Sequence, residues 1–99
     1  MTTSVIDLAL VPAQKVSVGD DALTVDLADG RTIIVPLAWY PRLLHASSAE
    51  RANWRAIGRG EGIHWPDLDE DISVESLLAG RRSGEKPESF RRWLAGRQV

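Results

Sequence analysis

The sequence predicts a small single domain of the α+β class, in which a three-stranded antiparallel meander and one extra extended segment pack with short helices. Three observations lead to this prediction. The first third of the chain alternates apolar and polar residues with the period of a strand. Later segments place helix-capping residues ahead of apolar positions at helical spacing. The length of 99 residues suits one domain with a thin core.

The meander occupies the first third of the chain. Its period of two predicts antiparallel strands near 14–19, 22–28 and 31–36, each with one face in contact with solvent. Asp29-Gly30 stands between the second and third strands. An Asp-Gly pair in that position predicts a hairpin with a type I′ turn, in which both central residues have positive φ.

The middle stretch, AWYPRLLHASSAERANWRAIG, is predicted to be helical. Pro41 is tolerated in a first helical turn, and Ser47 or Ser48 is a suitable N-cap for a second helix that includes Ile57. Three glycines at alternate positions then stop this helix. The segment 60–65 is expected to be extended, because the proline that follows restricts the residue before it.

Two short helices are expected in the last quarter of the chain. Ser73 is a good N-cap and Gly80 suits the position after a helix, so the first helix is predicted over 74–79. The final run, ESFRRWLAG, has apolar residues at i, i+3 and i+4, which form a small stripe on one helix face. We therefore expect residues 1–80 to form the α+β domain and 81–99 to form a basic tail of the same unit.

The composition limits the cellular compartments in which the protein is expected. The absence of cysteine excludes a disulfide framework and thiolate metal sites, and it fits a reducing compartment. No signal peptide is recognisable, and no apolar run approaches the ~20 residues of a membrane helix. We therefore expect a cytoplasmic protein without a membrane partner.

Charge is segregated along the chain, although the net charge is only −2. Residues 61–76 hold six acidic side chains and no basic one, whereas residues 77–99 hold six basic and two acidic ones. This pattern is open to two interpretations. The charges pair within the molecule or are solvated, or they form an interaction surface with two signs.

The acidic segment contains GIHWPDLDED, residues 62–71, which raises the question of a metal site. Three aspartates at alternate positions have the spacing that opens an EF-hand loop. The sixth and twelfth positions of that loop are Ile72 and Leu78, however, where glycine and an acid are required. A site built from His64, Asp67 and Asp69 would lack the further histidines that transition metals prefer, and it is the weaker interpretation.

Catalysis is also disfavoured. Ser73 or Ser76 could join His64 and Asp69 in a nucleophile–base–acid set, but no glycine-framed nucleophile elbow surrounds either serine. Two carboxylates for glycoside chemistry have no defined placement. We therefore predict no catalytic, cofactor or metal site.

A structural role accounts for more of the same stretch. Ile63 and Trp65 alternate, so both are expected to enter the core from one strand face while His64 points outward. Leu68 and Ile72 are expected to anchor the turn. One of three residues should cap the helix that follows: Asp69, Asp71 or Ser73.

Several runs together resemble a known family. VPLAWYPRLL, the stretch from ANW through GEGIHWPDLDEDISVESLL, and the Asp-Gly hairpin are similar to the bacterial domain-of-unknown-function family 2442 (DUF2442) over about residues 14–80. Tyr40 and Ser76 depart slightly, since another aromatic and glycine are expected there. The resemblance implies a compact α+β domain without an assigned activity. It also implies an antitoxin-type role, because members often stand beside small toxin-like proteins in two-gene modules.

The sequence therefore favours a non-enzymatic protein-binding module, in its most specific form an antitoxin-like partner of a small basic protein. An acidic segment can cover a basic partner surface. Tryptophan, tyrosine and arginine are the residue types enriched at interface hot spots. The candidate partner surface consists of Trp39, Tyr40, Arg42, His64, Asp67, Asp69, Glu70 and Asp71.

Two alternatives remain open. The first is a nucleic-acid-binding or regulatory protein that uses the arginine-rich tail, although the net negative charge argues against it. Its candidate contacts are Arg81, Arg82, Arg91 and Arg92. The second is a homodimer that forms through an exposed edge strand, 14–19 or 31–36.

Overall fold

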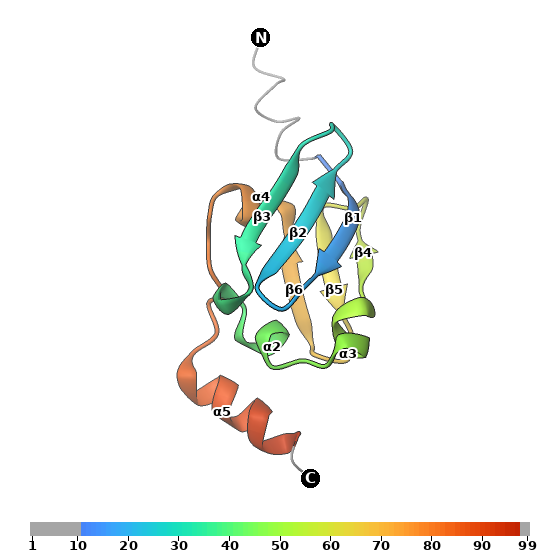
Figure 1. Cartoon of the computed structure of the whole chain (residues 1–99). Helices are drawn as coiled ribbons and strands as arrows, with labels where there is room; N and C mark the ends of the chain where they lie inside the picture. Colours follow the sequence, from blue (N-terminus) through green and yellow to red (C-terminus); the bar gives the residue numbers. More distant parts are fainter. Residues whose placement is uncertain (1–10, 98–99) are drawn as a thin grey trace.

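The computed structural model describes residues 11–97, which form two antiparallel three-stranded sheets and several short helices. Figure 1 shows the two sheets lying against each other, with the helices from the middle of the chain at one end and the last helix beyond them. This arrangement confirms the predicted α+β class.

The first sheet is the predicted meander. Its strands β1 (Ala13–Val18), β2 (Ala22–Leu27) and β3 (Thr32–Pro36) pair in chain order, and every strand end lies within one residue of its predicted position. The apolar residues of β2 point into the core, as the alternation predicts, because successive side chains of a strand face opposite sides. They are at most 1% exposed: Leu23, Val25 and Leu27.

The turn between β2 and β3 is not the predicted type I′ turn. Gly30 has φ +96°, but among residues 11–97 Asp69 is the only non-glycine residue with positive φ, so Asp29 does not share that conformation. Gly30 N donates to Leu27 O at 3.0 Å, and Leu27 N donates to Arg31 O at 2.8 Å. These bonds close a three-residue loop in which only the last residue is left-handed. Arg31 also binds the Asp29 carboxylate, which favours the longer loop.

Three short helical segments follow: η1 (Leu37–Trp39), α2 (Pro41–Leu44) and α3 (Ser48–Ala52). Pro41 is the first residue of α2, and Ser47 caps α3, as predicted. The cap is reciprocal, because Ser47 and Glu50 each accept a hydrogen bond from the other's backbone N–H, which satisfies two groups that a helix start leaves unpaired.

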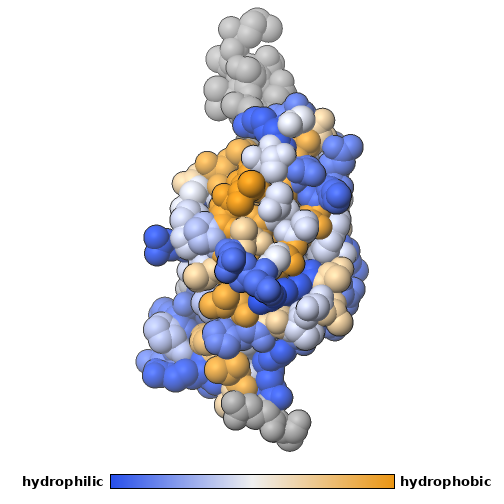
Figure 2. All heavy atoms as spheres, viewed as in Figure 1, coloured by the Kyte–Doolittle hydropathy of each residue, from blue (hydrophilic) through white to orange (hydrophobic). Residues whose placement is uncertain are grey.

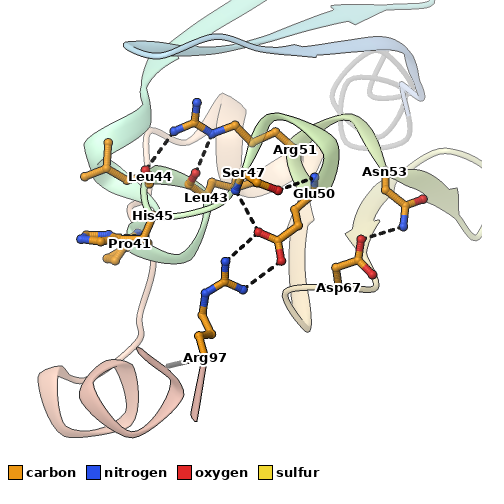
Figure 3. Close-up of polar contacts among 10 residues, drawn as sticks. All are labelled: Pro41, Leu43, Leu44, His45, Ser47, Glu50, Arg51, Asn53, Asp67 and Arg97. Carbon is orange, nitrogen blue, oxygen red and sulfur yellow. Dashed lines mark hydrogen bonds and ion pairs between the residues drawn. The ribbon is translucent and has the colours of Figure 1, made fainter. Parts of the chain in front are cut away.

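Arg51 joins α3 to α2. Its guanidinium donates to the carbonyls of Leu43 and Leu44, both at 2.9 Å, as Figure 3 shows. These carbonyls lie at the C-terminal end of α2, where a helix leaves carbonyl groups without a partner in the helix. The arginine therefore fixes the angle between the two short helices.

The second sheet is the main departure from the prediction. Its strands β4 (Arg55–Ile57), β5 (Gly62–Trp65) and β6 (Glu70–Ser73) pair in chain order, where the sequence predicted a helix through Ile57 and a single extended segment. The glycines explain the difference. Gly58 and Gly60 have φ of +65° and +93°, so they fold the chain back on itself and let the segments on either side pair.

The two last helices are confirmed as α4 (Val74–Leu78) and α5 (Pro87–Gly96). Ser73, one of the three predicted caps, accepts a hydrogen bond from Ser76 N at 3.0 Å. Gly80 has φ +72° just after α4, as a residue that ends a helix often does. Among the described residues no helix is long and apolar enough to cross a membrane.

The core lies between the two sheets. Ile63 and Trp65 are fully buried while His64 is only partly so, which confirms the predicted direction of β5. Leu68 and Ile72 are also buried, as predicted for residues that anchor the β5–β6 turn. The other three tryptophans pack against the core but are only partly buried: Trp39, Trp54 and Trp93.

Candidate partner surface at the β5–β6 turn and the C-terminal linker

The register of β5 and β6 spreads the acidic run over different faces. Trp65 pairs with Glu70, and His64 pairs with Asp71. Because directly paired residues of antiparallel strands point to the same side, Glu70 turns inward beside Trp65 and Asp71 turns outward beside His64. Asp69 lies in the turn with φ +49°, a conformation that aspartate tolerates. The eight residues of the predicted surface therefore do not form one patch.

The outer face of the second sheet carries a polar row of Arg55, His64 and Asp71, placed side by side by the strand pairing. His64 Nδ1 and Asp71 Oδ1 are hydrogen-bonded to each other. The Asp71 side chain remains 63% exposed and that of His64 19%. The contact thus orients the imidazole and leaves most of the carboxylate open to solvent.

The turn itself presents two more exposed carboxylates. Asp67 accepts a hydrogen bond from Asn53 Nδ2 at 3.0 Å, as Figure 3 shows. Within residues 11–97 neither Asp67 nor Asp69 forms an ion pair with a basic side chain. Leu68, between them, is fully buried and holds the turn against the core. We call Asp67, Asp69 and Asp71 the acidic tip.

Glu70 is separated from the acidic tip by its inward direction. It lines two neighbouring hollows of about 170 and 320 Å³, one shared with Tyr40 and the other with Arg42 and Glu85. Burial raises the pKa of Glu70 to about 7, and the nearby carboxylates of Glu85, Asp71 and Asp69 add to the shift. Arg42 opposes the shift because its positive charge stabilises the ionised carboxylate.

Glu70→Gln is expected to remove a pH dependence of stability. Between pH 4.5 and about 7 the unfolded state loses the Glu70 proton while the folded state keeps it, so the stability of the natural chain falls as pH rises through this window. The full shift corresponds to about 3 kcal/mol, which solvent screening at this partly exposed group reduces to about 1–2 kcal/mol. Urea unfolding of both chains at pH 5 and pH 8 measures the difference; an equal pH effect in both would contradict the assignment.

Arg42 is engaged with the C-terminal segment. Its Nη2 lies 2.6 Å from Glu85 Oε2, its Nε lies 3.0 Å from both oxygens of that carboxylate, and its Nη1 donates to Leu68 O at 2.9 Å. The guanidinium also lies 5.3 Å from the centroid of the Trp93 ring. Hydrogen bonds from Arg42 hold the pKa of Glu85 below its usual value. The predicted partner contact is therefore occupied within the molecule.

Two further residues of the predicted surface serve the domain itself. Tyr40 is buried, and its hydroxyl donates to Arg81 O at 3.1 Å. Trp39 is partly buried beneath the Arg82 guanidinium, which lies 5.1 Å from the ring centroid. Both aromatic side chains therefore lie against the linker after α4. A partner cannot reach Tyr40 without displacing that linker.

The four arginines proposed for nucleic acid lie on two separate segments. Arg81 and Arg82 belong to the linker after α4, and Arg91 and Arg92 lie on the side of α5 away from its apolar stripe. All four are exposed, and none forms an ion pair with a carboxylate of residues 11–97. The acidic segment and the basic tail thus do not neutralise each other within the described part of the chain.

The residues considered for metal binding do not come together in the described part of the chain. Between residues 11 and 97 no group of three or more histidine, cysteine, aspartate or glutamate side chains could hold a metal ion. Ser73 donates its hydroxyl to Ser76 Oγ at 2.8 Å and accepts from the backbone of the same residue, so its hydrogen bonds serve the cap of α4.

Glu85 is the residue of this region that sequence reasoning missed. It stands in the polar run RRSGEKP, which has no periodicity to show its direction, and its partner Arg42 is 43 residues away in the chain. A bidentate pair of this kind depends on the fold and has no local signal.

Comparison with known proteins identifies a family and similar solved structures. A family model described as "Protein of unknown function (DUF2442)" matches residues 13–83. A crystal structure of a protein of unknown function from Rhodospirillum rubrum ATCC 11170 is 30% identical and has a TM-score of 0.64, over 76% of this chain and 93% of that one. No curated protein matches this chain.

A second solved structure extends the likeness in fold. The solution structure of an uncharacterized protein from Chromobacterium violaceum has a TM-score of 0.67 over 95% of this chain and 83% of that one. Its sequence identity of 19% limits the comparison to the fold. The architecture therefore recurs in proteins whose sequences have diverged widely.

Proposed function

Because the chain belongs to the DUF2442 family of proteins of unknown function, we propose that it acts as a non-enzymatic protein-binding module that presents the acidic tip to a basic surface of another protein. The observation that carries this proposal is that the acidic tip is exposed and, in the described part of the chain, lacks lysine and arginine partners. Its three carboxylates are exposed and, within residues 11–97, none pairs with a lysine or an arginine: Asp67, Asp69 and Asp71.

The tip is also preorganised. Leu68 is fully buried at its centre, Asn53 holds the Asp67 carboxylate, and His64 holds that of Asp71. A rigid group loses less conformational entropy on binding than a flexible one. Fixed negative charges can therefore steer and orient a basic partner with little loss of conformational entropy on binding.

The partner that fits this tip is a small basic protein. The family resemblance implies an antitoxin-type role, and an acidic tip is the chemistry that would cover the basic, RNA-facing surface of a toxin-like protein. We propose that the complex forms in the bacterial cytoplasm. The first experiment is a pull-down with the tagged full-length chain from the source bacterium, with partners identified by mass spectrometry.

The double variant Asp67→Asn/Asp69→Asn is expected to bind the captured protein about tenfold more weakly and with a smaller salt dependence, because two charges are lost while side-chain shape is kept. Asparagine tolerates positive φ, so the turn at residue 69 is preserved. Calorimetric titration at two salt concentrations gives both quantities.

The matched control is Asp29→Asn. The Asp29 carboxylate lies in the β2–β3 turn, at the opposite end of the sheets from the β5–β6 turn (Figure 1). Its substitution is therefore expected to leave the affinity for the partner unchanged. Equal affinities for the double variant and the natural chain would remove the acidic tip from the proposed interface.

The exposed arginines of the tail support a second candidate function, the binding of nucleic acid through phosphate contacts. Recovery of RNA or DNA in place of a protein would favour it. Fluorescence anisotropy at about 50 mM salt, where electrostatic binding is strongest, then measures the affinity of the purified chain for nucleic acid.

A further inference from the structure

The last helix, α5, rests on the segment of α2 and α3 through contacts near each of its ends. Glu85, just before the helix, binds Arg42, and Arg97, just after it, lies 2.7 Å from Glu50 Oε1 and 2.9 Å from Glu50 Oε2. Figure 3 shows the second contact, with Arg97 reaching up to the start of α3. Between them the His45 and Phe90 rings meet edge to face at 5.1 Å. We call Arg42, His45 and Glu50 the helix dock.

Gly84, just before the docked helix, is the candidate hinge. The last fixed points of the linker are Tyr40, whose hydroxyl binds Arg81 O, and the 3.0 Å bond from Ser83 N to Trp39 O. The next residue is Gly84, and no atom outside its immediate neighbours would lie within 4 Å of a Cβ there. The family match also ends at residue 83. A change of direction at Gly84 would break one bond across it, from Glu85 N to Ser83 Oγ at 3.2 Å, and would leave the bonds of Tyr40 and Ser83 N to the rest of the chain in place.

Helix α5 is held on its own domain by two ion pairs and by ring contacts at its surface, with little full burial. No residue of the helix is fully buried, and its apolar stripe is only partly covered: Phe90, Trp93 and Leu94. Figure 2 shows this end of the molecule as a narrow apolar strip with hydrophilic side chains on both sides. When two identical chains exchange an element, every contact of that element, polar or apolar, forms again with the other copy, so exchange is a low-cost route to a dimer.

We propose that two copies of the chain exchange α5 about Gly84, so that each helix occupies the dock of the other copy in a two-fold dimer. Charge complementarity favours this occupant. The outer side of α5 carries Arg91 and Arg92, and the β5–β6 turn with the acidic tip lies at the same end of the sheets as the dock (Figure 1). Two copies that meet at this end bring the exposed arginines toward the exposed acidic tip, and within residues 11–97 of one copy no ion pair joins these two groups.

The test exploits the Glu50–Arg97 pair. Glu50→Arg and Arg97→Glu chains each place like charges together when α5 docks on its own domain or on an identical copy. In a mixture, exchange restores both pairs. Sedimentation velocity is expected to show a 1:1 dimer in the mixture, with a dissociation constant at least tenfold lower than that of either variant alone. A single chain carrying both changes controls for the lost Ser47–Glu50 contact and should associate like the natural protein.

A second pair keeps the test decisive if Glu50→Arg does not fold. Arg42→Glu and Glu85→Arg, placed in separate chains, reverse the ion pair at the other end of the helix in the same way, and exchange is expected to restore both pairs in a mixed dimer. Absence of the mixed dimer for both pairs of variants would overturn the proposal. Equal dimerisation of the natural chain and both charge variants would also overturn it, since the dimer would then form elsewhere, for example through an edge strand.

Discussion

Trp65→Ala is expected to lower the free energy of unfolding by about 3–5 kcal/mol, the range for removing a large aromatic side chain from a core. Trp65 is fully buried on the inner face of β5, and its Nε1 donates to Arg51 O at 3.0 Å. The substitution would leave a cavity between the sheets and would free a carbonyl in α3. A chain of this length is stabilised by roughly 5–15 kcal/mol, so the variant would lose a large share of its stability.

Urea unfolding followed by circular dichroism measures this loss, and Trp93→Ala is the matched control. Trp93 is the same residue type on α5, but it is only partly buried and lies outside the two sheets. Its removal is expected to cost about 1 kcal/mol or less, because little apolar surface returns to water. Equal losses for the two variants would mean that the core is not centred on Trp65.

Much of the first sheet could be predicted because its information is local. A strand with one wet face repeats every two residues, and β2 follows that rule from Leu23 to Leu27, so both its limits and its buried side are readable. The same holds for the caps at Ser47 and Ser73, whose side chains bind backbone groups within three residues. Local hydrogen bonds leave a local trace in the sequence.

The second sheet was only partly predicted because its strands are short and their patterns are masked. β6 reads EDIS, and three polar residues around one isoleucine resemble a turn as much as a strand. The pairing with β5 determines that Glu70 faces the interior while Asp71 faces solvent. Composition describes both simply as acids, so the sequence placed them on a single surface.

The candidate site was the hardest part to predict from the sequence, because its contacts join segments that are distant in the chain. Trp39, Tyr40 and Arg42 have the composition of an interface, and they do form one, but with the linker and tail of the same chain. Sequence alone indicates that such side chains form contacts, but it does not show which segment they contact. The exposed acidic tip is the part of the predicted surface that remains available to another protein.

Gly60→Ala is expected to destabilise the domain by about 2–4 kcal/mol through two effects that act together. Gly60 has φ +93°, a conformation that residues with a Cβ rarely adopt. An added Cβ would also lie only 2.6 Å from Pro12 Cβ, at the point where Ala13 N donates to Gly60 O at 2.7 Å. That bond joins the start of the first sheet to the β4–β5 turn, so relief of the clash would separate the two sheets at this edge.

Gly30→Ala isolates the first effect from the second. Gly30 has a similar φ of +96°, but a Cβ there would meet no atom within 4 Å. Its substitution is expected to cost about 1–2 kcal/mol, from backbone strain alone. Thermal and urea unfolding of the two variants then give the cost of the Pro12 contact as a difference. A Gly60→Ala loss no larger than that of Gly30→Ala would show that this edge yields without disturbing either sheet, and that the joint between the sheets lies elsewhere.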